Sequence, residues 1–410
     1  MNFISRIFNF NNVLRFHLRI IGPILLLCII GLVALKSASL DTLGQHSVFS
    51  NQIKWITIGL IVFFIIQFIR NNLFYEFAYI FYFILLVLLF ITLFMPETNG
   101  STRWIIIGGM QFQPSEFGKI IFIMAISRFI ADYRDSFSAH QLIISCAFLT
   151  LIPLSLIIKQ PDYGTGLMYV LPILPMLYWA NVNSKKLVLY IFPIISMLAQ
   201  QDLLMFYIWM FLLIVILLFI SKNITQVIFN FILNCSFGLL APYAWQHALK
   251  EYHRNRILQL LYPENDPLGA GYQILQSKVA IGSGGILGKG LGEGTQSYLR
   301  FLPIKDSDFI LSVISEEMGF FCILAITIIF LLFIYFSIDF SQRLFNRFQS
   351  LNIIGFCSLL FFHMIVNMSM VVGLFPVIGL PFPFISYGGS FMVTCFIAIG
   401  IINNIINNDL

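Results

Sequence analysis

The chain consists of one apolar run after another, and each run is long enough to cross a lipid bilayer. A transmembrane helix needs about 20 mostly apolar residues. Hydrophobic residues make up 59% of the 410 positions and charged residues only 10%, with a mean hydropathy of +0.91. A soluble protein carries about a quarter charged residues. The composition therefore predicts an all-α polytopic membrane protein.

Twelve apolar segments are candidate spans, but the segment 187–200 is short enough to be re-entrant or strongly tilted. We therefore expect 10–12 transmembrane helices in a single membrane domain, 1–410, with an extra helix pair at 185–222. The candidate spans are 20–37, 53–70, 74–95, 116–132, 141–158, 165–181, 187–200, 203–221, 224–245, 309–337, 352–374 and 384–404.

Basic residues near the ends of the apolar segments predict the orientation of the spans. Residues 1–19 contain three arginines, and we expect no cleavable signal there. The positive-inside rule then places the N-terminus in the cytoplasm. Alternation places Lys185 and Lys186 in the cytoplasm, the long polar stretch 246–307 outside and the C-terminus in the cytoplasm. The net charge of +5 is mainly this topology signal, and we expect no nucleic-acid partner.

The polar stretch 246–307 combines glycines with basic residues, and we expect it to form an extracytoplasmic loop that carries the chemistry. Glycines allow close backbone approach to a ligand and leave N–H groups free for an anion. In the run 282–294, Lys289 is followed by Gly290 and not by the Ser or Thr of a P-loop. The stretch therefore fits a phosphate on a lipid, or else a flexible loop that touches headgroups. Its other basic residues include Arg254, Arg256 and Lys278.

Ionisable residues within or beside membrane spans are costly and are therefore functional candidates. Glu116 and Lys119 are three residues apart on one predicted helix face and can pair, which is equally the pattern of a structural ion pair. Arg103 precedes Trp104, a residue typical of membrane interfaces. Asp162, in QPDYGTG, is expected to cap the next helix.

Asp308 lies where the chain re-enters apolar sequence after the polar stretch. A carboxylate at a membrane boundary can be held ready as a base. The structural alternative is that Asp306 or Asp308 caps the following helix. Further along, Pro and Gly interrupt apolar sequence at 366–390, a segment that includes Ser386. Irregular backbone at this depth is tolerated only around a cavity or inside protein, so we expect a cavity near the outer face.

Five stretches together resemble the SEDS peptidoglycan glycosyltransferases. They are NGSTRW (99–104), QPSEFGK (113–119), QPDYGTG (160–166), the long block 255–320 and GLFPVIGLPFPFISYGGS (373–390). Within that family, DPLGAGYQILQSK and GTQSYLRFLP are similar to the RodA branch, which serves cell elongation, more than to the FtsW branch, which serves division.

The resemblance implies polymerisation of lipid II into glycan strands on the outer face of the bacterial inner membrane, with undecaprenyl pyrophosphate leaving and Asp308 as general base. Two features depart from the family. Asp306 stands where a His is common, and 185–222 adds two apolar segments to the usual ten. The residues expected to contact substrate or to shape its cavity are Arg103, Glu116, Lys119, Arg254, Arg256, Lys278, Lys289 and Ser386.

The resemblance also implies the partners: lipid II, the growing glycan strand, a class B penicillin-binding protein as transpeptidase, and the rod-shape complex. All six cysteines fall within predicted spans, so no disulfide or thiolate metal site is expected in 246–307. The sequence identifies no cofactor, and a divalent cation, Mg²⁺ or Mn²⁺, that bridges Asp308 and the pyrophosphate stays open. The alternatives are a lipid II flippase, an FtsW-type enzyme or a scaffold for wall synthesis.

Overall fold

The computed structural model describes residues 16–39, 47–97, 101–107, 110–220, 223–247, 251–261, 270–298 and 306–409. Arg6, Arg15 and parts of the predicted outer loop, including 262–269 and 299–305, lie outside these described residues.

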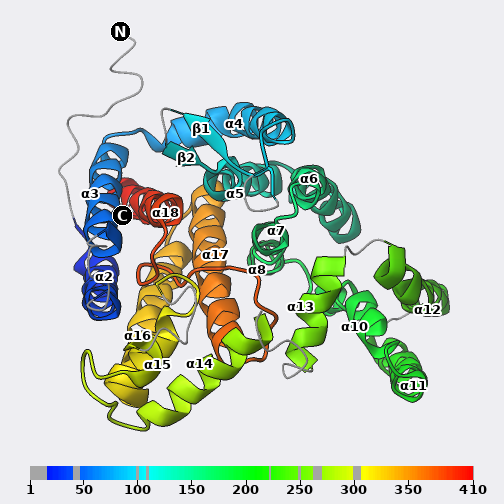
Figure 1. The fold of residues 1–410 in the computed structure, drawn as a ribbon. Helices are drawn as coiled ribbons and strands as arrows, with labels where there is room; N and C mark the ends of the chain where they lie inside the picture. The colour runs from blue at the N-terminus through cyan, green and yellow to red at the C-terminus, as the bar shows by residue number, and fades with distance from the viewer. Residues whose placement is uncertain are drawn as a thin grey trace, which may run out of the picture.

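The described chain is almost entirely helical, which confirms the predicted all-α polytopic class (Figure 1). The N-terminal half contains α2 (Leu18–Ala38), α3 (Ser47–Gln67), α4 (Asn71–Thr92), β1 (Ile105–Ile107), β2 (Met110–Phe112), α5 (Pro114–Tyr133), α6 (Ala139–Lys159), α7 (Tyr163–Val170) and α8 (Ile173–Trp179). The remainder contains α9 (Ser184–Leu189), α10 (Phe192–Ala199), α11 (Leu203–Ile220), α12 (Ile224–His247), α13 (Glu251–Leu261), α14 (Ala270–Gly284), α15 (Thr295–Tyr298), α16 (Ile310–Gln342), α17 (Arg347–Val371) and α18 (Gly389–Asp409).

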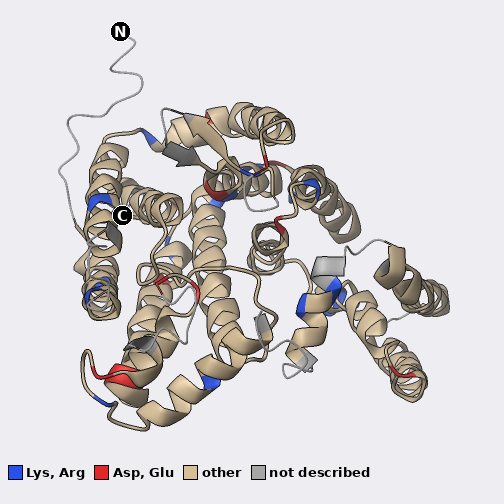
Figure 2. Cartoon of the chain, viewed as in Figure 1, with Lys and Arg blue, Asp and Glu red and all other residues tan. Residues whose placement is uncertain are grey.

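Nine of the described helices are long and apolar enough to span a membrane. The other three predicted spans are also helical, but none of them is a single long apolar helix. The segment 116–132 is α5, which carries several charged residues, whereas 165–181 and 187–200 are each broken into two short helices, α7–α8 and α9–α10. Most of the ribbon bears no charged residue (Figure 2). The protein is therefore a multi-pass membrane protein.

The core is centred on α17 and α18, whose apolar windows are 72% and 83% buried. Helix α18 packs along α3, α16 packs along α2, and α5 packs against both α4 and α17. The more peripheral spans are only 17–39% buried, which is expected where apolar side chains face lipid. The two central helices therefore hold the segments that surround them in a fixed arrangement.

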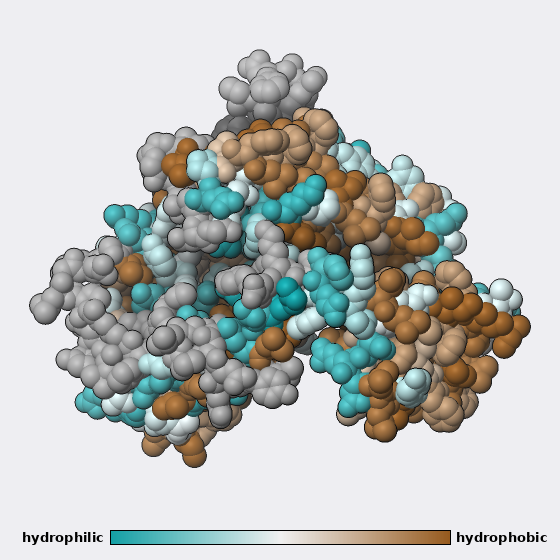
Figure 3. Space-filling model, turned by 45° about the vertical axis from the view of Figure 1, so that its right-hand side comes forward, coloured by the Kyte–Doolittle hydropathy of each residue, from teal (hydrophilic) through white to brown (hydrophobic). Residues whose placement is uncertain are grey.

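Helices α9 to α12 form a lobe of their own at one edge of the molecule (Figure 1). The lobe has a separate small core that includes Phe192, Phe206, Met210 and Leu213. Its outer surface is apolar, as the brown right-hand side of Figure 3 shows. The predicted extra segments at 185–222 make up most of this lobe.

The stretch predicted as the long outer loop is mostly helical in its described part. Helices α13, α14 and α15 occupy much of 246–307, and α14 packs along α16. The glycine-rich turn after α14 then folds back onto a kink in α16. Gly319 at the kink has φ +76°, and the backbone N–H groups of Lys289 and Gly290 donate to the carbonyls of Glu316 and Glu317 at 3.0 and 2.9 Å.

Candidate functional site

Asp308 lies two residues before the start of α16 and is held there by the core helix α17. The amide of Asn367 donates to the backbone carbonyl of Asp308 at 3.0 Å and to that of Leu380 at 2.7 Å. The carboxylate lies against Gly379, where an added Cβ would be 3.5 Å from Oδ2. The N-cap residue of α16 is Phe309, which makes no side-chain cap hydrogen bond. Neither Asp306 nor Asp308 therefore occupies the N-cap position predicted as the structural alternative.

The groups around Asp308 have opposite effects on the pKa of its carboxyl. Burial raises the pKa of the carboxyl, since it disfavours the charged form, while a hydrogen bond from Ser307 and the charges of Arg256 and Arg103 lower it. Burial has the larger effect, and the pKa is raised above its usual value of 3.8. The result is a carboxylate of increased basicity with two guanidinium groups nearby.

Arg256 reaches this region from α13. Its guanidinium donates to the carbonyl of Val377 at 2.6 Å and so ties α13 to the irregular segment before α18. Arg256 also lies at the edge of an apolar groove of 350 Å³. The groove lies between α6, α7, α13 and the irregular segment, with Leu154, Ile158, Tyr163, Leu167, Val170 and Phe375 among its lining residues. Part of the segment with Pro and Gly interruptions thus lines a groove, and Arg256 adds a cation to the apolar lining.

Arg103 comes to the site from the segment before the β1–β2 hairpin, in which Ile105 pairs with Phe112. Its guanidinium lies 3.5 Å from the carboxylate of Asp162 and 5.8 Å from the ring centre of Trp104. Asp162 caps α7, as predicted, by accepting from the backbone N–H of Thr165, and it also accepts from the Gln113 amide at 2.7 Å. Asp162 thus has a second role, which is to position Arg103.

Glu116 and Lys119 form the predicted pair, with 2.8 Å between the ammonium and the carboxylate. Lys119 is only 1% exposed, and its ammonium also lies 3.2 Å from Nε2 of His363. Thr165 extends this network to α7 through a contact of 3.5 Å with Glu116. Both residues lie on α5, and their contacts with His363 and Thr165 join this helix to α17 and α7. A buried ion pair is costly to break. The network therefore supports the elements that carry Asp162.

The remaining residues predicted to contact substrate lie in other parts of the structure. Lys289 pairs with Glu316 at 2.7 Å and with Thr295 at 2.8 Å, so it closes the turn onto α16. Lys278 is exposed on α14 beside Gly373, and Arg254 is half-buried on α13. Ser386 is buried, and its hydroxyl accepts from the backbone N–H of Phe382 at 2.8 Å. Of the predicted contacts, Arg103 and Arg256 are the two whose charges lower the pKa of Asp308.

Sequence reasoning missed Asn367 and His363, which orient Asp308 and Lys119 from within α17. It did not predict the contact of Glu317 with Ser37, whose hydroxyl donates to this carboxylate at 2.5 Å and joins α2 to α16. The available signal was the presence of polar side chains within an apolar span, because such side chains are rare in a membrane and usually have a hydrogen-bond or ion-pair partner. Their partners lie far away in the sequence and could not be read from it.

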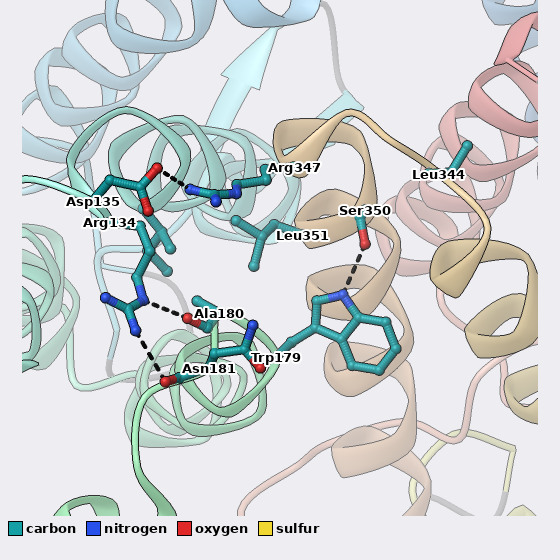
Figure 4. A pocket seen from close by; sticks show the side chains of 10 residues that line it. Arg134, Asp135, Trp179, Ala180, Asn181, Leu344, Arg347, Ser350 and Leu351 are labelled. Carbon is teal, nitrogen blue, oxygen red and sulfur yellow. Dashed lines mark hydrogen bonds and ion pairs between the residues drawn. The ribbon is translucent and has the colours of Figure 1, made fainter.

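A smaller cavity of 210 Å³ lies at the opposite end of the molecule, between α5, α8 and α17 (Figure 4). Arg134 donates to the carbonyls of Ala180 and Asn181, and Arg347 pairs with Asp135 at 2.5 Å. The Trp179 indole donates to Ser350 at 2.7 Å. The cations at this end thus have protein partners, and the cavity has no group comparable with Asp308.

A family model described as "Cell cycle protein", named for FtsW, RodA and SpoVE, matches residues 18–195 and 184–409. The chain belongs to this family. The two matched stretches overlap at 184–195, at the start of the α9–α12 lobe.

Curated relatives of the chain are named as enzymes of wall synthesis. The peptidoglycan glycosyltransferase MrdB of Escherichia coli (strain K12) is 31% identical over 94% of this chain and 93% of its own length. The peptidoglycan glycosyltransferase RodA of Treponema pallidum is 28% identical over 92% of this chain and 94% of its own length. A probable peptidoglycan glycosyltransferase FtsW of Trichlorobacter lovleyi is 34% identical over 75% of this chain and 69% of its own length.

Solved structures share the fold. A chain from a structure of a peptidoglycan synthase complex superimposes with a TM-score of 0.73 at 23% identity, covering 96% of this chain and 98% of that chain. The crystal structure of the rod shape determining protein RodA of Thermus thermophilus gives a TM-score of 0.64 at 20% identity, covering 97% and 98%. The fold of the chain is thus that of RodA.

Proposed function

We propose that this protein is a peptidoglycan glycosyltransferase that polymerises lipid II into glycan strands during cell elongation, with Asp308 as its general base. The observation that carries the proposal is the position of Asp308. Its carboxyl has a raised pKa and lies at the start of a membrane helix, within the influence of two guanidinium groups. Family membership and relatives named as peptidoglycan glycosyltransferases support the same reaction class.

In the proposed reaction, the C4 hydroxyl of one lipid II attacks the anomeric carbon of the lipid-linked strand. Asp308 accepts the hydroxyl proton as the new C–O bond forms, and undecaprenyl pyrophosphate departs with the electrons of the broken bond. General base catalysis of this kind contributes about 10²–10⁴-fold. Arg256 and Arg103 are two cations suited to stabilise the departing pyrophosphate. The apolar groove beside Arg256 suits part of an isoprenoid chain.

The roles of the other predicted residues remain proposals. Glu116 and Lys119 support the site through the packing of α5 and α17 and do not take part in the chemistry. Among the described residues, no group of three His, Cys, Asp or Glu side chains comes together. A Mg²⁺ or Mn²⁺ ion at Asp308 would therefore take further ligands from other oxygen atoms, such as those of the pyrophosphate and water.

We place Asp308 on the outer face of the bacterial cytoplasmic membrane and both termini in the cytoplasm, on the basis of the basic residues at the other end. The RodA-type relatives match 92–94% of the chain and the FtsW-type relative 75%, which favours the elongation role. A class B penicillin-binding protein and the rod-shape complex are the proposed partners. The similarity to a chain of a peptidoglycan synthase complex supports a partner of this kind.

The test is lipid II polymerisation by purified Asp308→Asn protein, with the cognate transpeptidase added. We expect polymer formation to fall at least 100-fold, because the amide cannot accept the proton. The matched control is Asp339→Asn, which removes a carboxylate from the other end of α16 where it pairs with Arg343. Undiminished polymer from the Asp308→Asn protein, with the control also active, would contradict the assignment.

A further inference from the structure

A large cavity lies far from Asp308, between the main body and the α9–α12 lobe. Its volume is 970 Å³, at the upper end of the range of about 300–1,000 Å³ found for ligand pockets. One wall is the start of α6, and the other walls are α9, the end of α11 and the start of α12. Asp162 follows the opposite end of α6, a helix of 21 residues, so the cavity is about 30 Å from the proposed active site.

The chemistry of this cavity changes from its mouth to its interior. Polar side chains gather at the helix starts. His140 lies in the first turn of α6, and Asn223 and Gln226 lie around the start of α12. Apolar side chains line the deeper part, with Leu233 about 13 Å along α12 from its first residue. Ile144 and Phe229, 59% and 64% exposed, also line it. A polar mouth above an apolar interior matches the two parts of a membrane lipid.

Two lysines at the mouth of the cavity favour a ligand with a negative charge. Lys185 and Lys186, which lie at the start of α9, both line the cavity. In the part of the chain that the structure describes, neither ammonium forms an ion pair with a carboxylate. The cations of the neighbouring cavity, by contrast, are satisfied by protein groups. Basic pockets between transmembrane helices on the cytoplasmic side are suited to anionic lipid headgroups.

We propose that this cavity binds one anionic diacyl phospholipid, with the phosphate at Lys185 and Lys186 and an acyl chain along Ile144, Phe229 and Leu233. The lipid would fill the space between α6 and the lobe, which is joined to the main body mainly through α8 and α9. A zwitterionic lipid would fit the apolar part but would not neutralise the lysines. The site is independent of the proposed glycosyl transfer.

The test is native mass spectrometry of the delipidated full-length protein in a neutral detergent, titrated with dioleoylphosphatidylglycerol or dioleoylphosphatidylcholine. We expect one tightly bound phosphatidylglycerol per chain and much weaker binding of phosphatidylcholine. The double variant Lys185→Gln/Lys186→Gln should bind phosphatidylglycerol about tenfold or more weakly, because each lysine near a membrane surface contributes to attraction of anionic lipid. Arg343→Gln, which removes a cation that already has Asp339 as its partner, should leave binding unchanged.

A second variant tests the apolar part. Leu233→Trp should block the interior and weaken binding of both lipids, while thermal unfolding and size-exclusion profiles of all variants stay close to those of the original protein. The proposal is overturned if the double lysine variant binds phosphatidylglycerol as the original protein does, or if phosphatidylcholine binds equally well. Equal competition by glycerol phosphate would also overturn it, since that result would show a site for a free anion and not for a lipid.

Discussion

At the residue scale, the proposed chemistry depends on the balance between burial and charge at Asp308. Burial raises its pKa above the usual 3.8, and Arg256 and Arg103 oppose that rise. Since the base acts as a carboxylate, activity should be lost as the pH falls through this raised pKa. The acidic limb of the pH–rate profile of polymerisation should therefore lie above pH 3.8.

Removing one of the opposing charges gives a directional prediction. In Arg256→Gln the pKa of Asp308 should rise further, so the acidic limb should move to higher pH. The measurement is the pH–rate profile of lipid II polymerisation by both proteins. Arg128→Gln is a matched control, because this arginine pairs with Asp132 on α5. An unchanged acidic limb in Arg256→Gln would show that the limb does not report Asp308.

At the scale of elements, the contact between the glycine-rich turn and α16 depends on two glycines with positive φ, Gly288 at +81° and Gly319. Gly319 has φ +76°, and a Cβ added there would lie 2.4 Å from the backbone nitrogen of Gly288. Gly319→Ala should therefore destabilise the protein by more than the 1 kcal/mol or so typical of a point mutation. The measurement is thermal unfolding in detergent.

The matched control is Gly282→Ala, in the helical part of α14, where an added Cβ meets no atom within 4 Å. Alanine favours a helix over glycine by about 1 kcal/mol, so this variant should be as stable as the original protein or more so. Equal stability of the two variants would mean that the turn does not constrain α16.

At the scale of the whole molecule, the proposed orientation can be tested by labelling. Leu287, in the glycine-rich turn, is 80% exposed, and Phe345, between α16 and α17, is fully exposed. A membrane-impermeant maleimide should label Leu287→Cys in intact spheroplasts and Phe345→Cys only after permeabilisation. The six native cysteines lie within membrane helices, so the protein without added cysteine should give little label. The reverse pattern would place Asp308 on the cytoplasmic face.

Sequence alone determined the features that depend on neighbouring residues. Apolar runs fixed the membrane class and the positions of the helices, and spacing fixed the Glu116–Lys119 pair and the Asp162 cap. The helices within the polar stretch 246–307 could not be read from the sequence. The stretch is rich in glycine and charge, yet α14 forms there and packs along α16.

Tertiary structure alone decided which distant groups meet. The sequence offered several cations for the substrate, but only the fold could bring Arg256 and Arg103 near Asp308 and give Lys289 to Glu316. It also brought the Asn367 amide within hydrogen-bond distance of the Asp308 carbonyl and formed the cavity lined by Lys185 and Lys186. The physical reason is that periodicity and capping act over a few residues along the chain. Charge pairing and burial depend on helix packing between segments that are far apart in sequence.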